Sequence, residues 1–280
     1  MVKSYFSRIF DLITRPEMKV LPGQLAFFLV LSIFPLLTLI GFIISKITLL
    51  SGPFFSAVSS FFPKNIANIL LPFVSQSSGT DNIALIAILG FILVSNGTYS
   101  IIVTSNQVFG IKDGDYLRGR LKALFMIFLL LFLFVFVFIV LAYGNNIFRY
   151  IINLDIFSNV RDSLSLIFFF FRWPVAFLIL FWFLKVFYTV APDEKISGKF
   201  MNKGALFTTV GWILATFVYS YYVTYIADYS LLYGSLSGII IMMMWIYFLS
   251  YIFVMGIAIN ADEYLVYKSK HKKKKNTNNS

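Results

Sequence analysis

The sequence predicts an all-α membrane protein, a bundle of six transmembrane helices with both termini on the cytoplasmic side. Composition is the first observation: 59% of the 280 residues are hydrophobic, 12% are charged and the mean hydropathy is +0.85, which excludes an ordinary soluble domain. Six long apolar stretches are the second observation, and the placement of lysine and arginine between them is the third.

Each apolar stretch meets the length of about 20 residues that a helix needs to cross a hydrocarbon core of about 30 Å. The stretches are residues 25–47, 83–103, 121–143, 166–190, 204–226 and 236–260, and they form one transmembrane domain over residues 25–264. The third stretch is apolar throughout residues 124–140, so we expect it to be the helix most exposed to lipid.

The basic residues fall almost entirely into alternate gaps between the stretches. Residues 1–24, 104–122, 191–203 and the C-terminal tail hold 17 of the 23 lysines and arginines, whereas the other three gaps hold Lys64, Arg149 and Arg161. Because cytoplasmic loops carry the excess of positive charge, both termini are predicted inside a multi-pass protein of the bacterial plasma membrane. The net charge of +11 flanks the stretches, which favours anchoring to anionic lipid over nucleic-acid binding.

The segments outside the stretches have their own patterns. Apolar residues recur at helical spacing among the basic residues of segment 1–24, which predicts an N-terminal amphipathic helix on the cytoplasmic leaflet. The first outer gap contains Pro53, Pro63 and Pro72, which divide it into short interfacial helices. Segment 265–280 is expected to be a basic, disordered cytoplasmic tail. A cleavable signal peptide is not expected, because the first apolar run begins only at Leu25 and is too long.

The residues that are missing from the stretches exclude most catalytic chemistry. The chain has no cysteine, its one histidine is His271 in the tail, and all 12 acidic residues lie in gaps or at the ends of stretches. Thiolate chemistry, a histidine-ligated metal, a Ser-His-Asp arrangement and a buried carboxylate relay therefore lack their members. We expect no enzyme, catalytic residue, metal or cofactor. The acidic pairs Asp113 with Asp115 and Asp193 with Glu194 are expected to be solvated loop charges.

Arg172 is the candidate contact for an anion. It lies about six residues into the fourth stretch, which at 1.5 Å per residue is roughly 9 Å below the outer edge. A guanidinium group at this depth has the geometry to bind a phosphate. The alternative is a side chain that reaches the outer surface or donates to a carbonyl freed by Pro174. The sequence leaves both interpretations open.

Asn96, Thr98 and Ser100 belong to a polar cluster in the inner half of the second stretch. Lipid offers no partner to so many hydrogen-bonding side chains, so this half of the helix is expected to face protein or a water-filled cavity. Together with Arg172, these three residues are the candidate substrate-binding residues. The alternative is that they only hydrogen-bond neighbouring helices to one another.

Small residues and prolines mark the expected packing seams and bends. Glycines let helix backbones approach closely, and proline kinks a helix by removing a hydrogen bond. The segment 234–238 has an alternative interpretation as an unwound, ligand-lining segment. The residues predicted for helix packing or hinges are Pro35, Pro174, Gly211, Gly234, Gly238 and Gly256.

Four ordered groups of residues resemble the YihY/BrkB family of inner-membrane proteins. They are residues 24–28 (QLAFF) with 31–37 (LSIFPLL), 204–206 (GAL), 233–236 (YGSL) with 245–247 (WIY), and 256–261 (GIAINA). The resemblance covers residues 18–264 and implies a six-span helical protein linked to serum resistance and envelope lipid phenotypes. A Gly-Ala-Glu type sequence is common at the last motif, and its acidic residue has no counterpart at Ile259 here. The family's old ribonuclease label conflicts with the missing catalytic residues described above.

Two functions of different classes follow from these observations. The first is a transporter or flippase-like handler of an anionic lipid or amphiphile in the cell envelope, which Arg172, the polar cluster and the proline-containing helices favour. The alternative is a non-transporting envelope scaffold or assembly protein, in which polar residues only hold helices together. Membrane lipids, anionic ones included, are the expected partners. The oligomeric state is left open, a homo-oligomer included.

Overall fold

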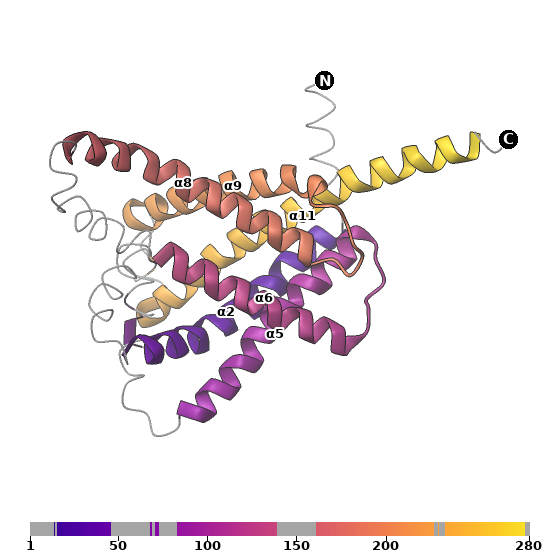
Figure 1. Cartoon of the computed structure of the whole chain (residues 1–280). Coiled ribbons are helices and arrows are strands. Elements are labelled where there is room, and N and C mark those ends of the chain that lie inside the picture. The colour runs from indigo at the N-terminus through magenta and orange to yellow at the C-terminus, as the bar shows by residue number, and fades with distance from the viewer. Residues whose placement is uncertain are drawn as a thin grey trace.

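The structure is a computed structural model of the chain, and it describes residues 14, 16–45, 68, 71–72, 83–138, 161–226, 229 and 233–277. Within these residues the architecture is all-helical, as the sequence predicts (Figure 1). The long helices are α2 (Pro16–Ser45), α5 (Ile83–Phe109), α6 (Tyr116–Phe138), α8 (Arg161–Val190), α9 (Asn202–Tyr225) and α11 (Ser237–Thr277), with 3₁₀ turns η4 (Gly198–Met201) and η5 (Gly234–Leu236).

The helices form one bundle in which α5 and α11 occupy the interior positions. Helix α5 packs against α2, α6 and α11, whereas α11 packs against α2, α5 and α9, and α8 covers α9 (Figure 1). The core between them is apolar, with fully buried side chains such as Leu25, Ile102, Met126, Leu184 and Met242. Continuous runs of Leu, Ile and Phe form helices here because a helix satisfies its own backbone hydrogen bonds without water.

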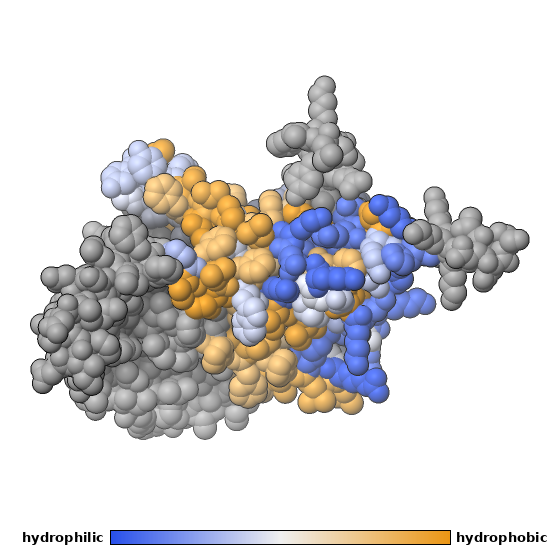
Figure 2. Space-filling model, turned by 45° about the horizontal axis from the view of Figure 1, so that its top comes forward, coloured by the Kyte–Doolittle hydropathy of each residue, from blue (hydrophilic) through white to orange (hydrophobic). Residues whose placement is uncertain are grey.

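Three of the predicted basic gaps meet at one end of the bundle. The α5–α6 connection, the α8–α9 connection and the part of α11 near residues 261–268 lie together at this end, and the last turns of α11 project beyond it (Figure 1). This end carries hydrophilic side chains beside a hydrophobic band (Figure 2). Ion pairs join the gaps, namely Lys122 with Asp193, Lys203 with Glu263, and Lys268 with Glu194. We call residues 110–122, 191–203 and 261–277 the basic end. Its assembly agrees with the alternation of charge, and the orientation in the membrane stays a prediction.

Length and composition single out two of the described helices as able to cross a membrane, Gly198–Tyr225 and Ser237–His271. Two shorter apolar helical segments, Met18–Ile33 and Pro174–Val190, accompany them. The six predicted crossings therefore stay a prediction for this chain.

The first helix differs from the sequence-based expectation at its start. Helix α2 begins at Pro16, so the last part of the predicted amphipathic segment 1–24 is continuous with the first long helix. Proline suits a first helical turn, because its φ is already helical and the missing N–H would be unpaired there. Met18 and Leu21 then bury against the core. The rest of that segment, and nearly all of the first outer gap with its interfacial helices, lies outside the described residues.

The last helix is longer than expected. The sequence predicts a disordered tail from residue 265, whereas α11 is helical to Thr277. Lysine is a good helix former, and contacts from the start of this segment hold it to the bundle. Tyr264 donates to Glu194, and the ring of Tyr267 lies 5.0 Å from that of Phe200 in η4. The helix therefore carries the basic residues of the tail on a continuous rod.

Candidate functional site

Helix α5 carries a polar segment through the interior of the bundle. The side chains of this segment are buried by α2, α6 and α11, so the half of α5 nearer the basic end faces protein. Its buried members are Ser95, Thr98, Ser100, Thr104, Ser105 and Asn106.

Hydrogen bonds join this part of α5 to two neighbouring helices. Thr98 Oγ1 donates to the carbonyl oxygen of Ala123 in α6 at 3.1 Å. On the opposite side, Ser32 Oγ of α2 donates to Leu93 O at 2.9 Å and would lie only 2.7 Å from a Cβ on Gly97. Thr98 thus has an interhelical partner, as the alternative interpretation of the cluster requires.

Ser100 and Thr104 differ from Thr98, because their hydroxyl oxygens have no hydrogen-bond partner among the described residues. They lie one helical turn apart and follow Gly97 along the side of α5 that faces α2. Ser250 of α11 is likewise buried with an unpartnered hydroxyl. The bundle interior therefore contains polar groups that the described side chains leave unsatisfied.

Asn96 contacts Arg120, a residue that the sequence analysis treats only as a basic residue of a gap. Arg120 Nη1 donates to Asn96 Oδ1 at 2.7 Å, and Arg120 Nε donates to the hydroxyl of Tyr116 at 2.9 Å. The guanidinium carbon lies 4.6 Å from the ring centre of Tyr99 and 5.0 Å from that of Tyr116. Cation–π attraction and hydrogen bonds together orient Arg120 between α5 and α6. We call Arg120, Asn96, Tyr99 and Tyr116 the arginine clamp.

Asp193 is the centre of a second polar group at the basic end. Asn106 Nδ2 donates to Asp193 Oδ2 at 2.7 Å and to Asp113 at 3.0 Å, and the backbone N–H of Gly114 donates to Asp193 at 3.1 Å. Lys122 donates to both Asp193 Oδ1 and the carbonyl of Ala191. Burial would raise the pKa of Asp193, but the hydrogen bonds from Lys122, Asn106 and Gly114 outweigh it and hold that pKa below its usual value.

Glu194, the next residue, is held from α11. Tyr264 donates to Glu194 Oε1 at 2.7 Å and Lys268 Nζ donates to it at 3.2 Å. These hydrogen bonds lower the pKa of Glu194, and the one from Tyr264 has the larger effect. Asp113 and Asp193 are exposed loop residues, as expected for solvated charges, but their carboxylates, like that of Glu194, also accept hydrogen bonds from neighbouring helices. Side chains from α5, α6 and α11 reach these carboxylates because the tertiary fold brings three separate gaps to one end.

The α8–α9–α11 junction contains the predicted glycine seam. A Cβ on Gly204 would collide with the carbonyl of Gly256 and lie 2.5 Å from Asn260 Cγ, and a Cβ on Gly211 would lie 2.7 Å from Ile252. Gly204 N donates to Asn260 Oδ1 at 2.7 Å. The close approach expected at Gly211 and Gly256 is confirmed.

A buried tyrosine crosses the same junction. Tyr188 of α8 donates to Phe253 O of α11 at 3.0 Å, and its hydroxyl lies 2.7 Å from Thr208 Oγ1 of α9. A Cβ on Gly256 would meet both hydroxyls. Gly256 therefore leaves room for Tyr188 as well as for α9.

Gly234 does not take part in packing among the described residues. It is exposed, a Cβ built on it meets no described atom within 4 Å, and its φ is +51°. Its role is the left-handed turn at η5, which a side chain would strain. Gly238 is buried near the start of α11. Pro35 lies inside α2 and Pro174 inside α8, so the predicted kinks fall within continuous helices.

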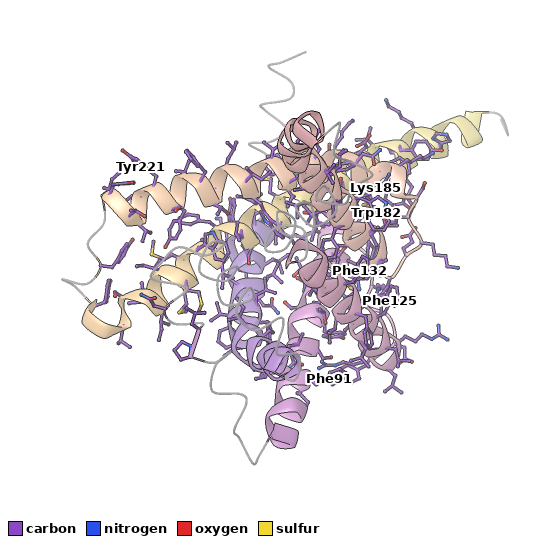
Figure 3. The ribbon with its side chains drawn as sticks, turned by 60° about the vertical axis from the view of Figure 1, so that its left-hand side comes forward. Phe91, Phe125, Phe132, Trp182, Lys185 and Tyr221 are labelled. Carbon is purple, nitrogen blue, oxygen red and sulfur yellow. The ribbon has the colours of Figure 1, made fainter. Side chains whose placement is uncertain are left out.

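Arg172 lies within α8, and its side chain falls outside the described residues. Its anion contact is untested by the structure and stays a prediction. Lys185 of the same helix is half-buried, and its Cε lies 3.7 Å from where a Cβ on Gly198 would stand (Figure 3). The lysine stem thus extends toward the basic end, as expected for a snorkelling side chain.

Comparison with known sequences decides the family. Residues 9–279 match the family described as Virulence factor BrkB.

The chain belongs to the BrkB family.

Relatives of this BrkB family member cover nearly the whole chain. The ribonuclease-like protein YfkH of Bacillus subtilis is 26% identical over 266 residues, which span 92% of this chain and 94% of YfkH. UPF0761 membrane proteins of Vibrio parahaemolyticus and Vibrio campbellii are 26% and 24% identical, each over 92% of this chain and 81% of the relative. No solved structure matches. The chain is a membrane protein of a family without a characterised function.

Sequence reasoning missed the residues that anchor both polar groups of this family member. Arg120, Lys122 and Asp193 were counted only as loop charges. No local pattern singles out Asn106. A usable signal was the spacing of Tyr116 and Arg120, which places a ring and a cation one helical turn apart. Among the described residues no group of three histidine or acidic side chains is arranged to hold a metal ion.

Proposed function

We propose that this protein crosses the plasma membrane six times and moves an anionic lipid or amphiphile between leaflets. The observation that supports the proposal is the buried polar segment of α5, in which the hydroxyls of Ser100 and Thr104 have no hydrogen-bond partner among the described residues. A buried unpartnered polar group costs about 1–3 kcal/mol. A passing headgroup or water would satisfy these hydroxyls during transport.

Arg172 extends the proposed path toward the other leaflet. It lies in α8 two residues before Pro174, whereas the basic end lies beyond Val190 at the far end of that helix. In the proposed orientation Arg172 contacts headgroups of the outer leaflet, since a guanidinium pairs well with phosphate. Pro35 and Pro174 contribute helix segments with free carbonyl groups, which transporters use to line substrate sites.

Labelling of single cysteines tests the topology, because the sequence contains no native cysteine. We expect cysteines at Ser78, Ser158 and Ser230 to react with a membrane-impermeant reagent in intact cells. Cysteines at Gly114 and Gly198 should react only after the membrane is opened. Reaction of the Gly114 position from outside would contradict the orientation.

Lipid movement tests the function. Purified protein in vesicles of fluorescent phosphatidylglycerol should expose inner-leaflet lipid to an external quencher faster than protein-free vesicles do. Replacing Ser100 with Ala and Thr104 with Val should slow this movement roughly tenfold, the effect of losing about 1.4 kcal/mol in the rate-limiting step. Thr209→Val is the matched control, because Thr209 is a buried hydroxyl of α9 that donates within its own helix at 2.8 Å.

Equal rates with and without protein would contradict transport and leave the scaffold or assembly role as the better interpretation. The ribonuclease-like name belongs to YfkH, and we propose that the present protein does not hydrolyse RNA. RNA cleavage by homogeneous protein, abolished by Asp113→Asn with Asp115→Asn, would overturn that part of the proposal.

A further inference from the structure

Arg120 is a half-buried cation without an acidic partner among the described residues. The three ion pairs in this part of the chain use Lys122, Lys203 and Lys268. Arg120 Nη1 donates to Asn96 Oδ1 and, at 3.5 Å, to Ser95 Oγ, and Nε donates to the Tyr116 hydroxyl. All three acceptors are neutral, and Nη2 makes no hydrogen bond to a described residue. A guanidinium group carries five N–H donors, so the arginine clamp leaves charge and donors unused.

Ring contacts as well as hydrogen bonds hold the arginine clamp in place. The Tyr99 and Tyr116 rings lie 5.8 Å apart at 70° and enclose the guanidinium from two directions. Gly119 makes this possible, since a Cβ there would stand 2.8 Å from Tyr99 Cε2. Asn96 uses its Oδ1 to accept from Arg120, and its Nδ2 makes no hydrogen bond to a described residue. Nη2 of Arg120 and Nδ2 of Asn96 are therefore two donors on neighbouring helices.

An apolar stripe runs along α6 beside the arginine clamp. Leu117 and Leu121 are 69% and 67% exposed, and the stripe continues with Phe125, Phe128 and Phe132 at spacings of three and four residues. Figure 3 shows Phe125 and Phe132 on one outer side of the molecule. At 3.6 residues per turn, Arg120 borders this stripe on one flank and Arg118 on the other. Positive charge thus meets lipid-facing surface at the edge of the basic end.

We propose that Arg120 and Asn96 bind the phosphate of an anionic phospholipid whose acyl chains lie along the apolar stripe of α6. Arginine forms strong charge-assisted hydrogen bonds with phosphate oxygens, and Asn96 Nδ2 adds a neutral donor. Arg118, which is exposed, strengthens the local positive potential. A soluble phosphate would leave the stripe unused, so the lipid is the better occupant. The proposal holds whether or not the protein moves lipid, and it stands apart from the proposed function.

Asn96→Asp separates a binding role from a structural one. The new carboxylate keeps an acceptor for Arg120 at the same place, so the contact between α5 and α6 is preserved or strengthened. It also neutralises Arg120 and replaces the Nδ2 donor with a negative oxygen, which repels phosphate. A clamp with a structural role alone would bind lipid as before in this variant.

The test measures lipid binding to the full-length protein in detergent. For phosphatidylglycerol we expect the dissociation constant to rise about tenfold in Asn96→Asp and in Arg120→Gln, the effect of losing about 1.4 kcal/mol. Binding of phosphatidylcholine should not change. Lys112→Gln is the control, because it removes one exposed charge from the same end without touching the clamp.

Unchanged phosphatidylglycerol binding in folded Asn96→Asp protein would overturn the proposal. An equal loss of phosphatidylcholine binding would also overturn the proposal, because the clamp would then not distinguish an anionic from a zwitterionic lipid. Displacement of phosphatidylglycerol by millimolar inorganic phosphate would assign the site to a soluble phosphate instead of a lipid. If Arg120→Gln does not fold, Asn96→Asp decides the matter, since its melting temperature should equal or exceed that of the parent.

Discussion

Asn106 and Asp193 hold each other by two hydrogen bonds that run in opposite directions. Asn106 Nδ2 donates to Asp193 Oδ2 at 2.7 Å, and the backbone N–H of Asp193 donates to Asn106 Oδ1 at 2.9 Å. Asn106 is buried in the last turn of α5, whereas Asp193 lies in the connection that follows α8. One asparagine thus fixes the position of a loop 87 residues away in the chain.

Replacing Asn106 with Ala should lower the free energy of unfolding by about 2 kcal/mol, because the Asp193 backbone N–H and carboxylate both lose a buried partner. Denaturant unfolding in detergent checks this value. Gln107→Ala is the control, since Gln107 is the exposed neighbour on the same helix and should change stability little. Equal stability of the Asn106→Ala protein and its parent would contradict the anchoring role.

Acid should weaken the basic end through Asp193. The pKa of Asp193 is lowered in the folded state, because the hydrogen bonds from Lys122, Asn106 and Gly114 outweigh the effect of burial. A lowered carboxyl pKa stabilises the fold at every pH above the ordinary aspartate value and loses this contribution as the pH falls through the folded-state pKa.

Melting temperatures of the parent and of Asp193→Asn should therefore differ at pH 7 and converge as the pH falls below the ordinary aspartate range. Asp115→Asn, an exposed change in the neighbouring connection, should track the parent at each pH. A difference between Asp193→Asn and the parent that stays constant down to acid pH would refute the linkage.

Tyr188→Phe should destabilise the protein by about 1 kcal/mol, because the buried hydroxyl donates to Phe253 O and meets Thr208 Oγ1. A double-mutant cycle with Thr208→Val isolates the pair. Side-chain hydrogen bonds inside membranes couple by about 0.6 kcal/mol on average, and we expect a value near that. Zero coupling would mean that the 2.7 Å contact adds nothing beyond packing.

Alanine substitutions at three glycines should rank in severity by what each new Cβ meets. Gly204→Ala should lower the free energy of unfolding by about 3 kcal/mol or more, at the upper end of what overpacking usually costs, because the new Cβ meets the backbone of Gly256. Gly211→Ala should cost about 1–2 kcal/mol, since Ile252 can shift its side chain. Gly23→Ala should be neutral or stabilising, because the nearest described atom that the new Cβ would meet, Cε2 of Tyr247, is 4.0 Å away. Thermal unfolding in one detergent gives the order, and a reversed order would contradict the packing described for α9 and α11.

The local sequence pattern was sufficient to predict the long helices and the burial of the α5 polar segment. An apolar run of more than 20 residues satisfies its backbone hydrogen bonds in lipid by forming a helix. For this reason the predicted start of the second stretch at Ile83 agrees with the start of α5, and the predicted end of the fourth stretch at Val190 agrees with the end of α8. Glycine spacing also predicted the Gly211 and Gly256 seam, since small residues at helical intervals form one face. Gly234 was predicted to pack between helices, but it forms a left-handed turn instead, a second use of glycine that sequence spacing does not distinguish from the first.

The sequence by itself determined a helical membrane protein and which charged gaps share an end, because hydropathy and charge act through composition and need no partner. Only the tertiary structure decided that Arg120 lies against Asn96, that Asn106 holds Asp193, and that Tyr188 reaches α9 and α11. These pairings join residues far apart in the chain, and each depends on helix rotation and crossing. Those quantities are set by side-chain packing across the bundle, to which no local pattern corresponds.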